Sequence, residues 1–409
     1  MKLVCRARHA KIDRAYRGEG IYVVVNDIGV PQMPALLNTV DPDGLLEYSV
    51  VFTDRSLNHM SVKFQGVMRD ISSTLKEVYA ADAVALVPGG GTFGMEAVAR
   101  QIAVDKRVMV LRNGWFSFRW SQIFEAGGIP ASETVMKARR TGNDAQAAFA
   151  PAPIEEVVAK ITADQPDVVF APHVETSSGM ILPDSYIKAV TDAVHAYGGL
   201  FVLDCIASGC AWVDMRATGV DLLISAPQKG WSASPSAGMV MMSEAGMAAV
   251  KASQSNSFAV DLGKWLSIME AYENGGHAYH ATMPTDALTA FRDTMIETQA
   301  YGFEKLAAAQ WEQGNRVRAA LAERGFASVA ADGFGAPGVV VSFASSPEMQ
   351  TGKPFASLGL QIAAGVPLQC DEGPAYSSFR LGLFGLDKLY DVDASVARLE
   401  NALDQILAA

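Results

Sequence analysis

The chain has 409 residues, of which 50% are hydrophobic and 19% are charged, a composition that excludes an intrinsically disordered or low-complexity protein. The formal net charge is −11 without a long basic run, which argues against binding to nucleic acid or to an anionic membrane surface. Four cysteines and six histidines are scattered without metal-site spacing, so no metal is expected, and so few cysteines fit a reducing, cytoplasmic compartment.

The segment from Met1 to Gly20 has no apolar stretch of the kind that a secretory signal needs. Its basic content leaves a presequence as an alternative to a plain cytoplasmic start. The longest apolar runs, such as residues 200–203, are far too short to cross a bilayer, so no membrane contact is expected.

Helical spacing and short apolar runs alternate from about residue 60 to residue 250. The predicted helices are 62–78, 92–103, 117–125, 154–162 and 183–197, and the predicted strands are 83–87, 107–111, 167–171, 200–204, 221–225 and 238–242. Strands that are apolar on both faces and separated by helices favour an α/β fold with a mostly parallel sheet covered on both sides.

The pattern changes after Pro284. A helical stretch over 286–325, with interruptions predicted near Gly302 and Gly314, precedes predicted strands at 338–343 and 377–383 and a closing amphipathic helix at 392–408. We therefore predict a large domain over residues 1–285, which includes an N-terminal extension, and a smaller α+β domain over residues 286–409.

Three groups of residues that could take part in binding or catalysis lie at or shortly after the ends of predicted strands. Residues 90–92 open a helix whose free N–H groups can hold a phosphate, with a plain tight turn as the alternative. Asp204 ends a strand, where open α/β sheets bind ligands, or else it caps a loop. Lys229 suits an amine of lowered pKa that forms a Schiff base, with a surface lysine as the alternative.

A glycine loop, an aspartate and a lysine in this order are what a pyridoxal-phosphate enzyme requires for the phosphate, the ring nitrogen and the aldehyde. The chain resembles the class V aminotransferases, nearest the alanine–glyoxylate and serine–pyruvate group, in the motifs GGGTFGMEA, NGWFSFR, HVETSSG, DCIAS, SAPQKGW, YHATMP and FRLGLFG. The resemblance implies fold type I of these enzymes, a mostly parallel seven-stranded sheet, pyridoxal 5'-phosphate as cofactor, and a homodimer with shared active sites.

The resemblance also implies roles for individual residues. Lys229 would be the catalytic Schiff-base lysine, and Asp204 would pair with the ring nitrogen. The other cofactor contacts would come from Gly90, Gly91, Thr92, Phe116, Thr176, Ile206 and Gln228, and, in the neighbouring subunit, from Tyr279 and Thr282. Arg380 would bind the substrate carboxylate, and Gly29 lies in a stretch that corresponds to the family's substrate-pocket turn.

Each assignment has a structural alternative. Phe116, or Trp115 in its place, is otherwise a core aromatic, and Thr176 is otherwise a turn residue. Arg380 is otherwise part of a structural ion pair, and Tyr279 otherwise packs within its own subunit.

The resemblance implies an aminotransferase that moves an amino group from a small amino acid to a 2-oxo acid of the glyoxylate or pyruvate type. The alternative is a lyase or other carbanion chemistry on the same fold: elimination, carbon–carbon bond formation, or a desulfurase-like reaction. A desulfurase needs a nucleophilic cysteine before the carboxylate arginine, and Cys370 stands ten residues before Arg380, beside acidic neighbours that would not lower its pKa.

Overall fold

The computed structural model describes residues 40, 41, 43–45, 49 and 56–408. Residues 65–409 form one compact unit, and residues 1–64 fall into another. Everything below concerns the first of these two units.

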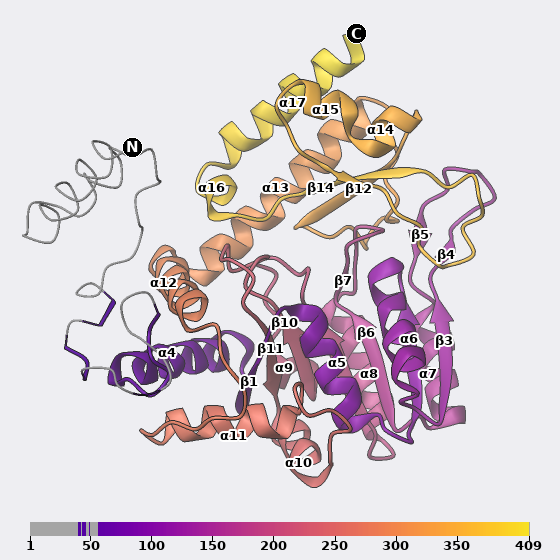
Figure 1. Ribbon diagram of the computed structural model, residues 1–409. Helices are drawn as coiled ribbons and strands as arrows, with labels where there is room; N and C mark the ends of the chain where they lie inside the picture. Colours follow the sequence, from indigo (N-terminus) through magenta and orange to yellow (C-terminus); the bar gives the residue numbers. More distant parts are fainter. Residues whose placement is uncertain (1–39, 42, 46–48, 50–55, 409) are drawn as a thin grey trace, which may run out of the picture. The chain divides into compact units, whose positions relative to one another are not determined.

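A seven-stranded sheet forms the centre of this unit (Figure 1). Its order is β1 (Ala83–Pro88), β11 (Ala237–Met242), β10 (Leu222–Ser225), β9 (Leu200–Asp204), β6 (Val168–Pro172), β2 (Arg107–Arg112) and β3 (Ser132–Lys137). Only β11 is antiparallel to its neighbours; all other pairs are parallel. The prediction of a mostly parallel seven-stranded sheet is therefore confirmed.

Helices lie against this sheet because its strands are apolar on both faces (Figure 1). They are α4 (Val62–Tyr79), α5 (Gly91–Ile102), α6 (Trp115–Gly127), α7 (Ile154–Asp164), α8 (Asp184–His195), α10 (Glu244–Ala252) and α11 (Leu262–Glu273). Helix α5 approaches β11 closely: a Cβ on Gly238 would lie 2.6 Å from the backbone nitrogen of Gly94. Two glycines thus fix the position of the helix that follows β1.

A second sheet lies in the C-terminal part of the chain, in orange to yellow in Figure 1. It consists of β12 (Val339–Phe343), β14 (Ser378–Gly382) and β13 (Ala363–Ala364), all antiparallel. Its core includes Phe355, Phe379 and Leu403. The surrounding helices are α12 (Thr285–Tyr301), α13 (Phe303–Glu323), α14 (Pro347–Thr351), α15 (Lys353–Ser357), α16 (Leu386–Leu389) and α17 (Val392–Ala408). The domain boundary near residue 285 remains a prediction.

The remaining elements are short. They are β4 (Arg139–Arg140), β5 (Phe149–Ala150), β7 (Val174–Glu175), β8 (Met180–Ile181) and α9 (Met215–Thr218). Of these, β7 bears on the site, because it follows β6 at the carboxyl edge of the large sheet.

The long helical stretch is interrupted at Gly302, as predicted, where φ is 105°. The interruption predicted near Gly314 is wrong, since α13 runs unbroken through it. A Cβ at Gly314 would lie 2.5 Å from the carbonyl oxygen of Pro337. This glycine therefore serves close packing against the segment before β12 and does not break the helix.

The segment that leads into β14 is tied to the edge of the seven-stranded sheet. Lys137 forms an ion pair with Asp371 at 2.7 Å, and Arg140 donates a hydrogen bond to the carbonyl oxygen of Glu372 at 3.2 Å. The Glu372 carboxylate in turn accepts hydrogen bonds from the backbone N–H groups of residues 368–370. This segment, residues 368–372, is called the docked loop below.

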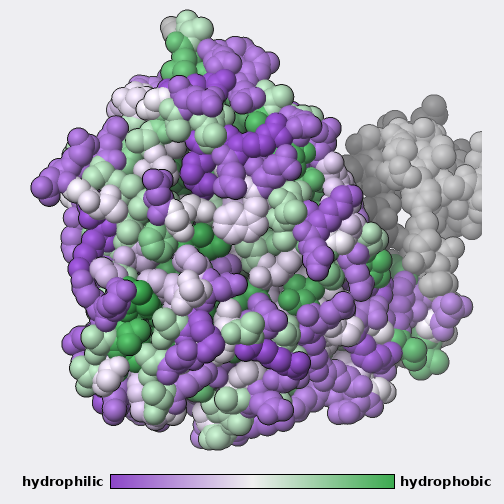
Figure 2. Space-filling model, turned by 180° about the vertical axis from the view of Figure 1, so that it is seen from behind, coloured by the Kyte–Doolittle hydropathy of each residue, from purple (hydrophilic) through white to green (hydrophobic). Residues whose placement is uncertain are grey.

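Hydrophilic and hydrophobic side chains are interspersed over the face shown in Figure 2, without a broad hydrophobic area on the coloured surface. Within the described residues, every helix is too short or too polar to span a lipid bilayer.

Candidate active site

The carboxyl ends of β1, β9 and β10 lie at one edge of the large sheet. This follows from the pairing, because β9 and β10 are parallel and β11 reverses direction between β10 and β1. The glycine loop, Asp204 and Lys229 follow these three strands, so the structure brings the three predicted groups to the same edge.

The glycine loop packs directly against the segment after Asp204. A Cβ on Gly91 would lie 2.4 Å from Cδ1 of Ile206, so a larger residue would displace the Ile206 side chain. Helix α5 begins at Gly91, and its N-cap residue, Gly90, provides no side-chain cap. The first N–H groups of α5 are therefore available to an anion.

Asp204 is a buried carboxylate, 6% exposed. One of its oxygens accepts a hydrogen bond from the backbone N–H of Ile206 at 2.9 Å, and it forms no ion pair within the described part of the chain. Burial raises the pKa of Asp204 to about 7; the charge of Glu175 adds to this shift and that of Arg119 opposes it. Such a group is stabilised by a cationic ligand.

Lys229 lies in the loop after β10. Burial, and then the charge of Arg380, lower the pKa of its amine, which favours the neutral, nucleophilic form. Its Nζ is 5.2 Å from the ring centre of Phe384. A Cβ on the next residue, Gly230, would lie 2.0 Å from the carbonyl oxygen of Gly209, so the lysine loop touches the loop that follows Asp204.

Two guanidinium groups flank the ring of Phe116. Arg119 lies 5.0 Å and Arg380 lies 5.6 Å from the ring centre. Arg119 also donates a hydrogen bond to Oγ1 of Thr92 at 3.0 Å, which joins this aromatic to the start of α5. The Nε of Arg380 donates to the carbonyl oxygen of Ala364, and Arg380 forms no ion pair among the described residues. Its two Nη groups thus suit a carboxylate of the substrate.

Thr176 follows Glu175 in the turn after β7. The Glu175 carboxylate accepts hydrogen bonds from the backbone N–H groups of Phe116 and Ser117. The NGWFSFR and HVETSSG motifs therefore meet in space, and Thr176 and Phe116 lie on the two sides of the same contact.

Four predicted site residues are not joined to this group by any contact described above. Tyr279 is 65% exposed, and its hydroxyl lies 3.5 Å from Oγ1 of Thr282 in the segment between α11 and α12. Oε1 of Gln228 is buried without a hydrogen-bond partner among the described residues. Gly29 lies outside the described residues.

The sequence analysis missed the roles of Glu175, Arg119 and Phe384. Glu175 and Arg119 stand inside the quoted motifs HVETSSG and NGWFSFR, and Phe384 stands in FRLGLFG. The available signals were the carboxylate of Glu175 beside Thr176 and the charge of Arg119 near Phe116. Their hydrogen-bond partners lie in distant segments of the chain.

Comparison with known proteins decides the family. The model of the family described as aminotransferase class-V matches residues 45–344 of this chain. The chain belongs to the class-V aminotransferases.

Individual relatives agree with this assignment. Over 266 residues this aminotransferase is 26% identical to alanine–glyoxylate aminotransferase 1 of Saccharomyces cerevisiae, covering 61% of this chain and 66% of the yeast protein. Over 360 residues it is 27% identical to 2-aminoethylphosphonate–pyruvate transaminase of Paraburkholderia phymatum, covering 84% and 89%. The structure of an alanine–glyoxylate aminotransferase from Nostoc sp. has a TM-score of 0.73 at 20% identity, covers 86% of this chain and 89% of that one, and shows the same fold.

Pyridoxal phosphate is the cofactor of this class-V aminotransferase, in fold type I. The residues present fit it on three observations. Among the residues that the structure describes, the Asp204 carboxylate is buried without an ion pair and Oε1 of Gln228 is buried without a hydrogen-bond partner. The glycine loop leaves N–H groups beside Ile206 that its N-cap residue does not cap.

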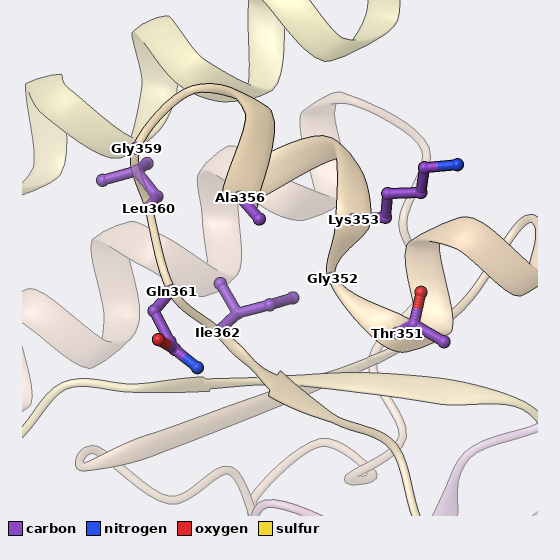
Figure 3. A pocket seen from close by; sticks show the side chains of 8 residues that line it. All are labelled: Thr351, Gly352, Lys353, Ala356, Gly359, Leu360, Gln361 and Ile362. Carbon is purple, nitrogen blue, oxygen red and sulfur yellow. The ribbon is translucent and has the colours of Figure 1, made fainter.

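Two of the hollows among the described residues differ in their relation to this group of contacts. One, of about 560 Å³, is lined by Lys229 and Phe384 and by the acidic residues Glu297 and Asp387. The other, of about 350 Å³, lies around Ile362, with Thr351 and Lys353 on one side and Gln361 on the other (Figure 3). Of the described residues that line the second hollow, Lys353 is the one that is charged, and none of them belongs to the candidate active site.

Proposed function

We propose that this aminotransferase moves an amino group from a small amino acid to a 2-oxo acid of the glyoxylate or pyruvate type. The acceptor class is supported by the names of its relatives from yeast and Paraburkholderia phymatum, which use glyoxylate and pyruvate. The observation that carries the proposal is that Asp204 and Lys229 come at the ends of neighbouring parallel strands, and that the charge of Arg380 lowers the pKa of the Lys229 amine.

We assign the cofactor's phosphate to the N–H groups and hydroxyl of Gly90, Gly91 and Thr92, with Gln228 beside them. Phe116 and Ile206 would cover the two faces of the ring, and Thr176 would reach its hydroxyl group. Phe116 is supported by its two flanking guanidinium groups, and Ile206 by its contact with the glycine loop.

When bound, pyridoxal phosphate supplies an electron-accepting ring that stabilises negative charge on the carbon next to the donor's nitrogen. Asp204 would hold the proton on the ring nitrogen, because a buried carboxylate is stabilised by that positive charge. Lys229, whose pKa is lowered, would take the proton from the donor's α-carbon and deliver it to the carbon that carries the cofactor's aldehyde. With the acceptor, Lys229 would move a proton in the opposite direction. Arg380 would hold the carboxylate of either substrate in place.

A desulfurase-like reaction is disfavoured by the position of Cys370. The thiol is buried, its Sγ lies 3.3 Å from the carbonyl oxygen of Arg112, and burial raises its pKa to about 12. A nucleophilic cysteine requires the opposite shift and access to the substrate.

We further propose that the protein is a cytoplasmic homodimer in which Tyr279 and Thr282 reach the phosphate of the neighbouring subunit. The exposure of Tyr279, and its distance of 3.5 Å from the hydroxyl of Thr282, support a pair that presents polar groups outward. We also propose that Gly29 lines the substrate pocket. We place the boundary between the two domains near residue 285.

The proposal is tested by mixing the holoenzyme with single amino donors and no acceptor. A donor that converts the bound cofactor stoichiometrically to its amine form, with release of one 2-oxo acid, supports amino transfer. Release of ammonia or sulfide without that conversion would contradict it and support the lyase alternative.

Lys229→Ala is the matched variant. We expect it to lose turnover by several orders of magnitude and to lose the cofactor link that borohydride makes permanent. Retention of either property would remove Lys229 from the site.

A further inference from the structure

Glu175 is 0% exposed, and its carboxylate forms no ion pair with the residues that the structure describes. Five N–H or O–H groups lie within hydrogen-bonding distance of its oxygens. These are the backbone N–H groups of Phe116 (3.1 Å), Ser117 (2.8 Å) and Ser177 (3.0 Å) and the hydroxyls of Ser117 (2.7 Å) and Ser177 (2.7 Å). Its charge is therefore balanced by these hydrogen bonds and, beyond ion-pair distance, by the charge of Arg380.

Three of these groups belong to the first turn of α6. The N-cap residue of α6, Gly114, has no side chain to cap the helix, and Glu175 and Ser177 replace it from a segment about 60 residues away. The N–H of Trp115 donates to Oγ of Ser177 at 2.8 Å. An anion at this helix end is also favoured by the helix dipole.

The side chains of Ser177 and Glu175 pack closely against Gly114. A Cβ on Gly114 would lie 2.1 Å from Oγ of Ser177 and 2.7 Å from Cγ of Glu175. The backbone of the first turn of α6 thus packs directly against the side chains of the turn after β7, and the carboxylate sets their separation.

We propose that Glu175 is a positioning residue, which locks the first turn of α6 and so fixes Phe116 for the cofactor ring and Thr176 for its hydroxyl group. This inference rests on the proposed roles of Phe116 and Thr176. Glu175 acts through Phe116, because its oxygens hold the backbone N–H of that residue and of the next one. The lock also bears on the positions of Arg119 and Arg380, because both guanidinium groups lie over the ring of Phe116.

The principal variant is Glu175→Gln, which keeps the volume but turns an amide toward N–H donors. In the cofactor-free full chain we expect faster amide hydrogen exchange at residues 115–117. Titration with pyridoxal phosphate should give a dissociation constant raised by roughly tenfold or more, because an acceptor of charge-assisted hydrogen bonds is lost. Ser177→Ala is a milder variant that removes one hydroxyl and should shift both readouts in the same direction.

The matched control is Asp221→Asn. Asp221 is also a buried carboxylate, accepts the backbone N–H of Phe201 at 2.8 Å and pairs with His195 at 2.8 Å, but it precedes β10 at the opposite edge of the sheet. We expect this variant to lower the melting temperature and leave the cofactor dissociation constant unchanged. If Glu175→Gln behaves in the same way, its role is only structural and the proposal is overturned.

A double-mutant cycle that combines Glu175→Gln with Phe116→Leu tests whether Glu175 acts on cofactor binding through Phe116. If Glu175 acts through Phe116, the double variant should bind pyridoxal phosphate no more weakly than Phe116→Leu alone. Additive losses of cofactor affinity, or a Phe116→Leu variant with unchanged cofactor affinity, would overturn the proposal that Glu175 acts through Phe116. Failure of the proposed function is seen separately, as a wild-type chain that binds no pyridoxal phosphate, whereas the exchange experiment tests the lock without cofactor.

Discussion

Asp204 shows how a functional carboxylate destabilises the fold that holds it. In the unfolded chain its pKa has the ordinary value of 3.8, and burial raises this to about 7 in the folded chain. Between these values the folded chain binds a proton that the unfolded chain has released, so the free energy of unfolding falls as pH rises. A cation held against Asp204 removes this cost.

The first prediction concerns Asp204→Asn. Without cofactor, the wild-type protein should lose stability between about pH 4 and about pH 7 through this group, and the variant should lack that part of the pH dependence. At about pH 8 the cofactor-free variant should be at least as stable as the wild type while its turnover falls. Denaturant unfolding across this pH range checks the prediction; a less stable variant at high pH would contradict it.

The second prediction concerns Arg380. Arg380→Ala should raise the KM for carboxylate substrates by roughly a hundredfold, because two charge-assisted hydrogen bonds are lost. The dissociation constant of the cofactor should change far less. Arg380→Lys keeps the charge without the planar fork and should recover only part of the affinity. The reverse pattern, with cofactor affinity lost first, would make Arg380 a structural residue.

At this scale, the sequence supported the prediction of Lys229 and Asp204 because each directly follows a strand that is visible as an apolar run. Arg119 and Glu175 were beyond such reasoning. Their partners are 27 residues and 58 or 59 residues away, and hydrogen bonds across such separations exist only once the chain has folded.

Among the elements, the loop that holds Lys229 and the loop that follows Asp204 touch through their backbones. The third prediction is that Gly230→Ala destabilises the fold by roughly 1–3 kcal/mol and weakens cofactor binding, because its Cβ would overlap the carbonyl oxygen of Gly209. Gly66→Ala in α4 is the control. Nothing lies within 4 Å of its added Cβ, so helix propensity should stabilise the variant by about 0.5–1 kcal/mol. Thermal unfolding and cofactor titration of both variants provide the comparison, and equal behaviour would argue against the contact.

Element prediction succeeded where burial gives a continuous apolar run, as in β9, whose predicted and observed bounds coincide. It missed β3 because that strand, SETVMK, lies at the sheet edge, with its residues exposed or half-buried. Gly314 misled for another reason. A glycine that permits close packing has the same local signature as a glycine that ends a helix, and only the distant Pro337 distinguishes them.

For the whole molecule, the proposed shared active sites give the fourth prediction. Lys229→Ala and Tyr279→Ala subunits should each have low activity, but dimers with one of each contain one site with both native residues. Random mixing should therefore restore about a quarter of wild-type activity. The measurement is activity after co-refolding, with sedimentation to confirm the dimer. No gain over the separate variants would place Tyr279 outside the neighbouring site.

The docked loop has a consequence for the thermodynamics of substrate recognition. Its ties to Lys137 and Arg140 hold the chain eight and nine residues before Arg380, so the strand with the proposed carboxylate ligand is anchored before any acid arrives. Little conformational entropy then remains to be lost on association. Small acids should be selected by fit to a preset receptor, and small-angle scattering should record nearly the same radius of gyration with and without them.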